Sequence, residues 1–281
     1  MDQEAKWSGL GIPAHVARRI SEAAVLLAAL APRGEKVEIW APAEVGVRAT
    51  GVTMRAGTPP RWDLAWADPG AKAVNDRRFA LALATELGCA LPGARALQSL
   101  EGIAWPARWV CKVAWTAAGR DRARGEGEPA GELRARVARL VARGAVLEPW
   151  LDRICDFGVC GAVGRPAHPP HALVVDARGT FRGIERGTAL EPAELAEVAR
   201  AYAAVSAALA RAGYAGPFGL DGFVYRDESG ARALHPFCEL NARHTFGHIA
   251  HALGCRVLGF GEPPPGATTL VAGEITAWAA S

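Results

Sequence analysis

The sequence predicts an α+β protein, because segments with helical periodicity alternate with short apolar runs that end at proline or glycine. Residues 191–213 have the clearest helical pattern, with proline near the start and Gly213 at the end. Residues 108–115, RWVCKVAW, are typical of a strand, and the turn DESG at 227–230 separates two further strands. A chain of 281 residues is long enough for about two domains.

The first part of the chain follows the same alternation. A helix is expected over 14–31, where apolar residues recur at helical spacing: Val16, Ile20, Leu27 and Leu30. The runs KVEIWAP (36–42) and WDLAWADP (62–69) end in proline and predict short strands. Residues 75–94 predict a helix that Gly88 closes.

A glycine-rich segment follows the strand at 108–115. Residues 116–131 contain four glycines and equal numbers of acidic and basic residues, which predicts a solvated loop. The helix expected next, over 132–144, has one apolar stripe: Leu133, Val137, Leu140 and Val141.

The second half of the chain predicts more strands than helices. Strands are expected over 145–151 and 156–163, and a proline-rich connection at 165–171 leads to a hairpin over 172–181. After the two strands around DESG, a last helix is expected over 245–254, with its first residue, a threonine, as N-cap.

Bulk properties exclude several classes of protein. The net charge of +3 is too small to indicate a nucleic-acid partner. The opening residues, MDQEAKWSGLG, lack a signal-peptide pattern, and no stretch approaches the ~20 apolar residues of a membrane-spanning helix. We therefore expect a cytoplasmic protein without a membrane partner. The six cysteines include no Cys-x-x-Cys pair, so free thiols are expected rather than a disulfide framework.

The segment CELNARHTFG (238–247) carries the strongest chemical signal. In a strand, alternate side chains share a face, so Glu239, Asn241 and Arg243 are expected to point the same way. A carboxylate, an amide and a guanidinium pack poorly in a core, but they suit a hard cation together with phosphate oxygens.

Three further residues suit the same chemistry. Lys112 lies in an apolar strand just before the glycine-rich segment, where a phosphate would supply its partner. Glu148 stands between an apolar run and a proline, as an acceptor at the end of a strand. Asp221, inside the apolar FGLDGFVY, adds an oxygen ligand of the kind that magnesium prefers.

The spacing of Asp221 and Glu239 poses a geometric question. A tight hairpin at DESG would place Asp221 opposite a residue near Pro236, about 10 Å along the strand from Glu239. Either a bulge around Pro236 takes up the difference, or Asp221 is not a direct metal ligand. The sequence leaves both alternatives open.

Five motifs together resemble the ATP-grasp family of carboxylate–amine ligases. They are NDRRF, WVCKVAWTAAGR, VLEPWLDRICDFGV, GPFGLDGF and CELNARHTFG, in that order between residue 75 and about 255. The last is similar to the peptide ligases of natural-product pathways. The resemblance implies an ATP-grasp fold of two α+β subdomains over 73–281, with 105–147 as the small lid, preceded by a short α/β domain over 1–72.

The resemblance also implies a set of nucleotide contacts, with ATP and Mg²⁺ as cofactors. Asp156 is expected at the ribose in preference to Asp152. The remaining contacts are Lys112 for the α- and β-phosphates, Gly119 and Arg120 in the loop over the γ-phosphate, Arg77 as a further phosphate contact, and Glu148 with the Leu151 backbone at the adenine.

Metal and reaction chemistry follow from the same resemblance. Asp221, Glu239 and Asn241 are expected to hold Mg²⁺, and Arg243 to steady the transferred phosphate and the tetrahedral intermediate. The implied activity joins a carboxylate to an amine through an acylphosphate, with an amino acid or small peptide as substrate. A non-catalytic nucleotide-binding relative and a carboxylate kinase are the alternatives. A homodimer is allowed for, although the sequence does not determine the oligomeric state.

Histidines and cysteines form two further groups. His244, His248 and His251 share one face of the last helix, but the sequence places no fourth zinc ligand, and they suit substrate contacts equally well. The second group matches no metal-binding spacing: Cys155, Cys160, His168 and His171.

Overall fold

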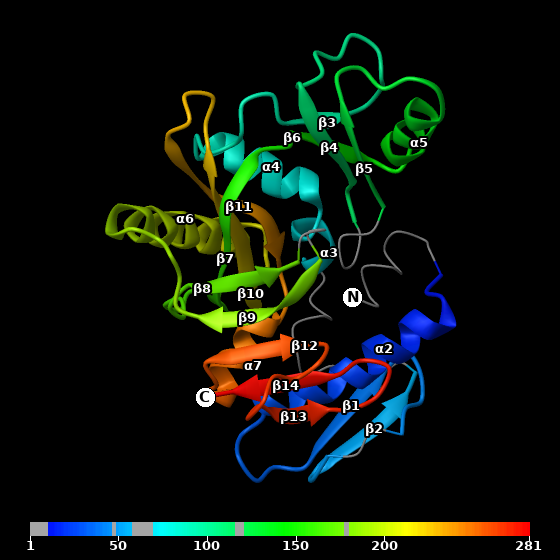
Figure 1. Ribbon diagram of the computed structural model, residues 1–281, viewed down its shortest axis with the longest axis vertical. Coiled ribbons are helices and arrows are strands. Elements are labelled where there is room, and N and C mark those ends of the chain that lie inside the picture. The colour runs from blue at the N-terminus through cyan, green and yellow to red at the C-terminus, as the bar shows by residue number, and fades with distance from the viewer. Residues whose placement is uncertain (1–10, 47–48, 58–69, 116–120, 177–179) are drawn as a thin grey trace.

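The computed structural model describes residues 11–46, 49–57, 70–115, 121–176 and 180–281, and it combines helices with antiparallel sheets (Figure 1). The α+β class is therefore confirmed. In these ranges no helix has both the length and the apolar character that crossing a bilayer requires.

A four-stranded antiparallel sheet lies at the top of Figure 1, in the order β3-β6-β4-β5. Its strands are β3 (Arg95–Leu97), β4 (Arg108–Val113), β5 (Arg122–Glu126) and β6 (Ala145–Pro149). Helix α5 (Gly131–Val141) packs on it and buries Val137 against Trp109, Cys111 and Leu147. The predicted lid range 105–147 covers most of this sheet, and β3 joins it from outside that range.

Strand β5 corrects the prediction of a loop over 116–131. Residues 122–126 pair with β4 from Lys112↔Arg122 to Arg108↔Glu126. The charges that indicated a loop are compatible with an edge strand, whose outer side meets water. Gly125 is needed there, because a Cβ would lie 2.4 Å from Trp109 Cζ2.

The larger sheet has eight antiparallel strands in the order β11-β10-β7-β8-β9-β12-β14-β13. They are β7 (Asp152–Ala162), β8 (His171–Val175), β9 (Phe181–Arg186), β10 (Pro217–Arg226), β11 (Arg232–Asn241), β12 (Val257–Phe260), β13 (Thr268–Val271) and β14 (Ala277–Ala280). The last three are four-residue strands that the sequence analysis did not predict.

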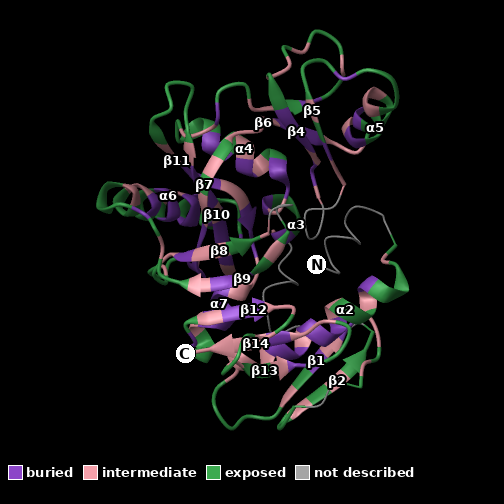
Figure 2. Ribbon diagram, in the orientation of Figure 1, coloured by how far each residue is buried: buried purple, intermediate pink, exposed green. Residues whose placement is uncertain are grey.

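Helices cover both faces of this sheet. On one face α4 (Arg77–Glu86) and α6 (Pro192–Arg211) bury a core that includes Phe157, Val159 and Leu220 (Figure 2). On the other face α7 (Phe246–Leu253) packs against β7 and β9. Residues that point away from α6 are therefore available for a site beside α7.

The N-terminal segment packs against the C-terminal strands. It comprises α2 (Ala14–Ala24), the 3₁₀ helix η1 (Val25–Leu30), and a parallel pair of β1 (Val37–Ala41) and β2 (Val52–Ala56). Leu26 shares a hydrophobic cluster with Leu258 and Val271. The short helix α3 (Ala71–Val74) precedes α4. The predicted strand 62–69 lies outside the described residues, and the division at residue 72 stays a prediction.

Candidate active site

The β10–β11 hairpin places the predicted metal ligands side by side. Asp221 pairs with Glu239, and Gly219 pairs with Asn241, so all of these positions share one face of the sheet. The register shifts after this point: Phe223, two residues after Asp221, pairs with His235, four residues before Glu239. Two steps on β10 therefore match four steps on β11. Of the two alternatives for Asp221, the structure contains the bulge.

The residues at the bulge explain why it forms there. Pro236 has no backbone N–H to lose from the ladder, which is why proline is tolerated at such irregularities. Gly222 lies opposite the extra residues, and a Cβ there would be 2.4 Å from Phe157 Cζ and 2.6 Å from the Pro236 carbonyl oxygen. The sequence thus encodes the close approach of two backbones at this point.

The two carboxylates have opposite pKa shifts. Burial and then the neighbouring charge of Glu239 raise the pKa of Asp221 to about 7. Burial opposes ionisation of Glu239 too, but Arg77, Lys112 and Arg243 together lower the pKa of Glu239. The amide of Asn241 donates to Asp221 Oδ2 at 3.2 Å. Fewer positively charged side chains therefore act on Asp221 than on Glu239.

Arg77 connects this hairpin to the four-stranded sheet. Its Nη2 lies 2.7 Å from Glu239 Oε1, and its Nη1 donates to the Val113 carbonyl at 3.0 Å. Asp76 caps α4 by accepting from the Arg78 backbone N–H, which fixes the start of that helix. The guanidinium of Arg77 thus holds the Glu239 carboxylate in place in this structure. Its contact with phosphate stays a prediction.

Lys112 and Glu148 form an ion pair that the sequence analysis did not predict. Lys112 Nζ lies 2.6 Å from Glu148 Oε2, and their side chains are only 13% and 14% exposed. They come from the neighbouring strands β4 and β6. Glu148 lines a small cavity together with Arg77 and with Cys238 of β11, so this pair lies close to the hairpin, and the charge of Lys112 lowers the pKa of Glu239. The family resemblance predicts nucleotide contacts for both residues instead: the α- and β-phosphates for Lys112 and the adenine for Glu148.

The predicted ribose and adenine contacts lie where β6 leads into β7. Leu151 is half-buried between the two strands. Asp156 pairs with Phe223 and accepts from Arg153 Nη1 at 2.5 Å, whereas Asp152 is exposed at the strand end. Arg153, which sequence reasoning missed, lies with its guanidinium carbon 3.9 Å from the centre of the Phe223 ring.

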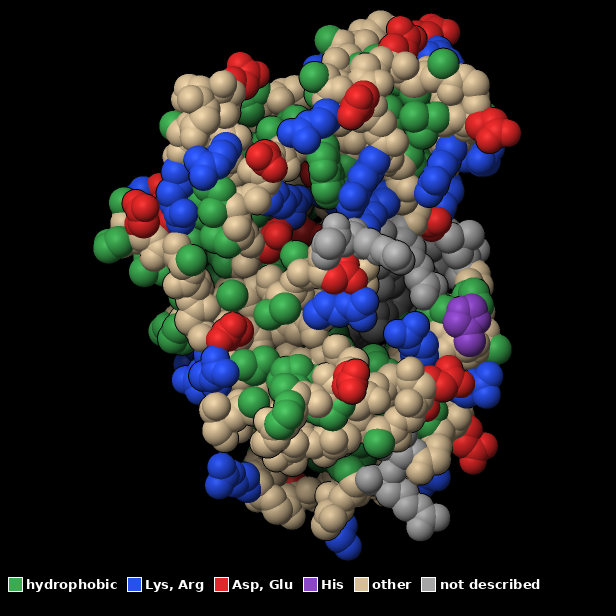
Figure 3. All heavy atoms as spheres, in the orientation of Figure 1, with side chains coloured by type: hydrophobic (Ala, Val, Ile, Leu, Met, Phe, Trp, Pro, Cys, Tyr) green, Lys and Arg blue, Asp and Glu red, His purple; other side chains and the backbone are tan. Residues whose placement is uncertain are grey.

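Two groups complete the comparison with the predicted site. Arg243 is half-buried, and its charge lowers the pKa of both Asp221 and Glu239, so it lies beside the carboxylates. Gly119 and Arg120 lie outside the described residues. In the space-filling view, acidic and basic side chains meet at a recess below the four-stranded sheet (Figure 3).

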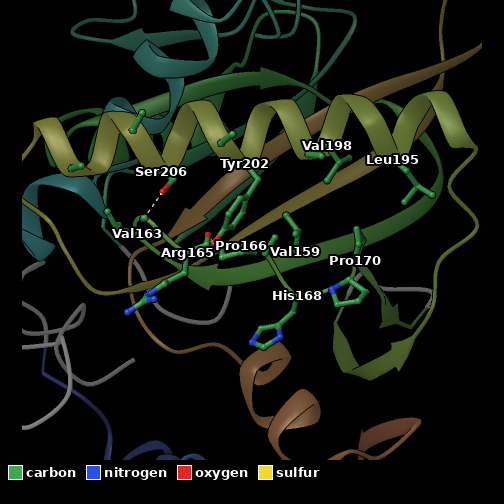
Figure 4. Close-up of a pocket in the computed structure, with 17 residues that line it drawn as sticks. Val159, Val163, Arg165, Pro166, His168, Pro170, Leu195, Val198, Tyr202 and Ser206 are labelled. Carbon is green, nitrogen blue, oxygen red and sulfur yellow. Dashed lines mark hydrogen bonds between the residues drawn. The ribbon is translucent and has the colours of Figure 1, made fainter.

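A larger cavity of about 760 Å³ lies on the opposite face of the eight-stranded sheet (Figure 4). It is lined by α6 and by the segment that connects β7 to β8, with Val159, Leu195 and Tyr202 among its walls. Among the described residues, no predicted site residue lines it. Its apolar walls offer few groups for charge chemistry, so the charged residues around Glu239 are the better candidate site.

The backbone is partly similar to several solved structures. N5-carboxyaminoimidazole synthetase from Staphylococcus aureus has a TM-score of 0.44 and 12% identity, over 63% of this chain and 47% of that one. Biotin carboxylase from Campylobacter jejuni has a TM-score of 0.48 and 15% identity, over 69% and 48%. The ATP-grasp ligase PsnB, complexed with a minimal precursor, has a TM-score of 0.43 and 20% identity, over 65% and 56%.

The chain spans about half the length of the synthetase and the carboxylase. No family model and no curated protein matches the sequence.

Proposed function

We propose that this protein is an ATP- and Mg²⁺-dependent carboxylate–amine ligase of the ATP-grasp type. One observation carries the proposal. Arg77 contacts Glu239, on the hairpin of the larger sheet, and the Val113 carbonyl, on the four-stranded sheet next to Lys112, so basic side chains and a set of oxygen ligands lie together between two α+β units. A magnesium–triphosphate needs both kinds of group at one place.

The donor set fits magnesium. Asp221 and Glu239 present carboxylates from directly paired positions, and Asn241 adds an amide within hydrogen-bond distance of Asp221. Two neighbouring carboxylates raise the cost of ionising both, and a divalent cation removes that cost. When bound, Mg²⁺ neutralises phosphate oxygens and so favours transfer of the terminal phosphoryl group.

The basic residues have distinct proposed tasks. Lys112 would turn from Glu148 towards the phosphates, and Arg243 would neutralise charge on the transferred group. Arg77 would keep Glu239 ionised and correctly placed, since its guanidinium already binds that carboxylate. Glu148, once released from Lys112, would be free to accept from the adenine amino group.

The reaction follows from these placements. A substrate carboxylate oxygen attacks the terminal phosphorus of ATP, and ADP leaves. The amine then attacks the acyl carbon of the acylphosphate, phosphate leaves with the bonding electrons, and the nitrogen loses a proton to the phosphate or to solvent. We propose an amino acid or a small peptide as the substrate, so that the product contains a peptide bond. Water must be kept out while the acylphosphate exists, because hydrolysis would waste it.

Binding and turnover can be tested separately. Calorimetry with a non-hydrolysable ATP analogue and Mg²⁺ measures binding, and release of ADP and phosphate with a panel of amino acids and peptides measures turnover. We expect Glu239→Ala to abolish turnover and Lys112→Met to weaken analogue binding at least tenfold. Glu228→Ala, in the exposed turn of the same hairpin, and Lys36→Met, on the exposed surface, are the controls.

The results distinguish the alternatives. ADP release that depends on both a carboxylate and an amine supports the ligase. ADP release that needs the carboxylate alone identifies a carboxylate kinase. Nucleotide binding that Glu239→Ala leaves unchanged, with no turnover on any substrate, identifies a non-catalytic binding protein. If the analogue does not bind at all, the proposal is wrong.

A further inference from the structure

Three potential metal ligands lie together outside the candidate active site. They are Cys160 in β7, His171 at the start of β8 and His251 in α7, and one ligand atom from each lies within 4.8 Å of the others. We call these three residues the thiol–imidazole cluster. Each of the two groups noted in the sequence contributes to it, because α7 packs across β7 and brings the groups together.

Two glycines leave the space that the cluster occupies. A Cβ on Gly158 would lie 2.5 Å from His171 Nε2. A Cβ on Gly247 would lie 2.9 Å from the same nitrogen and 3.0 Å from Cys160 Sγ. Any other residue at either position would therefore push the imidazole or the thiol away. The backbone comes close to the cluster from both the sheet side and the helix side.

The imidazoles have nitrogen atoms without partners. His171 is only 3% exposed, and its buried Nδ1 has no hydrogen-bond partner among the described residues. His251 Nε2 is also buried without a partner. The His251 ring donates a hydrogen bond to the Pro169 carbonyl. The donor is Nδ1, since Nε2 has no partner among the described residues. Metal-binding histidines are commonly oriented in this way, with the second nitrogen bonded to a carbonyl.

The neighbouring histidines serve other contacts. His248 Nδ1 accepts from the Thr245 backbone N–H at 3.0 Å, and His248 Nε2 lies 2.8 Å from the Gly161 carbonyl oxygen. Both of its nitrogens are therefore used in capping α7 and fastening it to β7. The His168 ring stacks on His251 at 4.5 Å between centroids, which supports that ring from one side. His251 thus differs from His248, the other histidine of α7.

We propose that Cys160, His171 and His251 bind a divalent cation of borderline softness, with Zn²⁺ as the best match. A ligand set of one thiolate and two neutral imidazoles binds zinc in preference to magnesium or calcium. Metal–ligand bonds of about 2.0–2.3 Å at tetrahedral angles give ligand separations of roughly 3.5 Å. The side chains would close by about 1 Å around the ion, and three protein ligands leave a fourth position for water or a substrate group.

The imidazoles of the cluster are in the protonation state that a metal needs, whereas the thiol must lose its proton on binding. Burial lowers the pKa of His171 to about 3, so its imidazole is neutral at physiological pH. Burial raises the pKa of the Cys160 thiol to about 12, so the sulfur carries its proton when no cation is present. Binding would form the metal–sulfur bond and release this proton to solvent, one for each ion bound.

The cluster is a neighbour of the candidate magnesium ligands but separate from them. Gly158 pairs with Asp221 on one side and with His171 on the other, so both sets lie on the same face of the sheet. Above Gly219 the space is filled by Thr245, whose Cγ2 would lie 2.8 Å from a Cβ there. The threonine side chain thus stands over the strand between the two sets.

Metal binding can be measured without nucleotide or magnesium. The purified full chain would be stripped with a chelator and titrated with Zn²⁺ in competition with a chromogenic chelator, and with Co²⁺ while recording its absorption. We expect one ion per chain, one proton released, and a thiolate-to-cobalt charge-transfer band. Cys160→Ser should remove that band, and His251→Gln should weaken Zn²⁺ binding at least tenfold.

The controls separate this site from adventitious binding. Cys155→Ser removes a thiol from the same strand, and His15→Gln removes an exposed imidazole, and neither should change the titrations. His251 lies on the less buried side of the cluster, so its variant is expected to fold, which circular dichroism would check. Substoichiometric binding, or binding unchanged in both Cys160→Ser and His251→Gln, would overturn the proposal. Failure of the ligase assay would leave it standing.

Discussion

Replacing Asp221 by asparagine should change stability in a pH-dependent way. The free energy of unfolding of the variant minus that of the wild type should be larger at pH 8 than at pH 5. Because the pKa of Asp221 is raised from 3.8 to about 7 in the folded protein, the folded state binds a proton more tightly than the unfolded state between these two values. Wild-type stability therefore falls as pH rises through this window. Asparagine is neutral throughout, so the variant loses this contribution.

The size of the effect follows from the two pKa values. One pKa unit corresponds to about 1.4 kcal/mol, and integrating the difference in bound protons from pH 5 to pH 8 gives roughly 2–3 kcal/mol. The stability of Asp221→Asn minus that of the wild type should rise by this amount between the two pH values. The subtraction removes the titration of shared groups that do not interact with position 221, and the removal of the charge of Asp221 from beside Glu239 contributes to the measured difference.

Urea unfolding in the presence of a metal chelator, followed by tryptophan fluorescence, gives both stabilities. The chain has nine tryptophans to report on unfolding. Glu228→Gln, in the exposed turn of the same hairpin, should show the same difference from wild type at both pH values. Adding Mg²⁺ at pH 8 should stabilise the wild type more than Asp221→Asn. A stability difference that does not change with pH would refute the electrostatic account of this hairpin.

Two further predictions concern how the site is held. Gly222→Ala would place a Cβ 2.4 Å from an aromatic carbon and 2.6 Å from a carbonyl oxygen, so thermal unfolding should show a loss of about 3 kcal/mol, whereas Gly46→Ala meets nothing within 4 Å and should cost little. Arg77→Met would leave Glu239 without its buried partner, so urea unfolding should show a loss of about 2 kcal/mol. Arg78→Met, which breaks a more exposed pair, should cost under about 1 kcal/mol. Equal losses for the two arginine variants would contradict this reasoning.

The local pattern of the hairpin was accessible to sequence reasoning. Alternation alone placed Glu239 and Asn241 on one face, and the structure has them there. The spacing left open a bulge at Pro236 or an Asp221 that is no direct ligand, and the bulge that forms depends on how Gly222 packs against Phe157, which is a contact between separate strands. Local pattern therefore predicted which residues share a face, while tertiary packing set the register.

Other features depend on contacts that no local pattern carries. Strand β5 is charged because it lies at the edge of its sheet, and edge strands and loops look alike in composition. The Lys112–Glu148 pair depends on which strands are neighbours. The thiol–imidazole cluster combines residues from β7, β8 and α7, so each member seemed isolated until the elements were assembled.

The packing of the N-terminal segment against the C-terminal strands has a consequence for biosynthesis. Glu22 accepts from the Ile275 backbone N–H at 2.9 Å, and Val25 and Leu26 share a cluster with Val271. Contacts between such distant positions close the longest loops and form late. During translation, α2 and η1 emerge from the ribosome long before β13. Their apolar side therefore stays exposed to solvent while the hairpins between them fold.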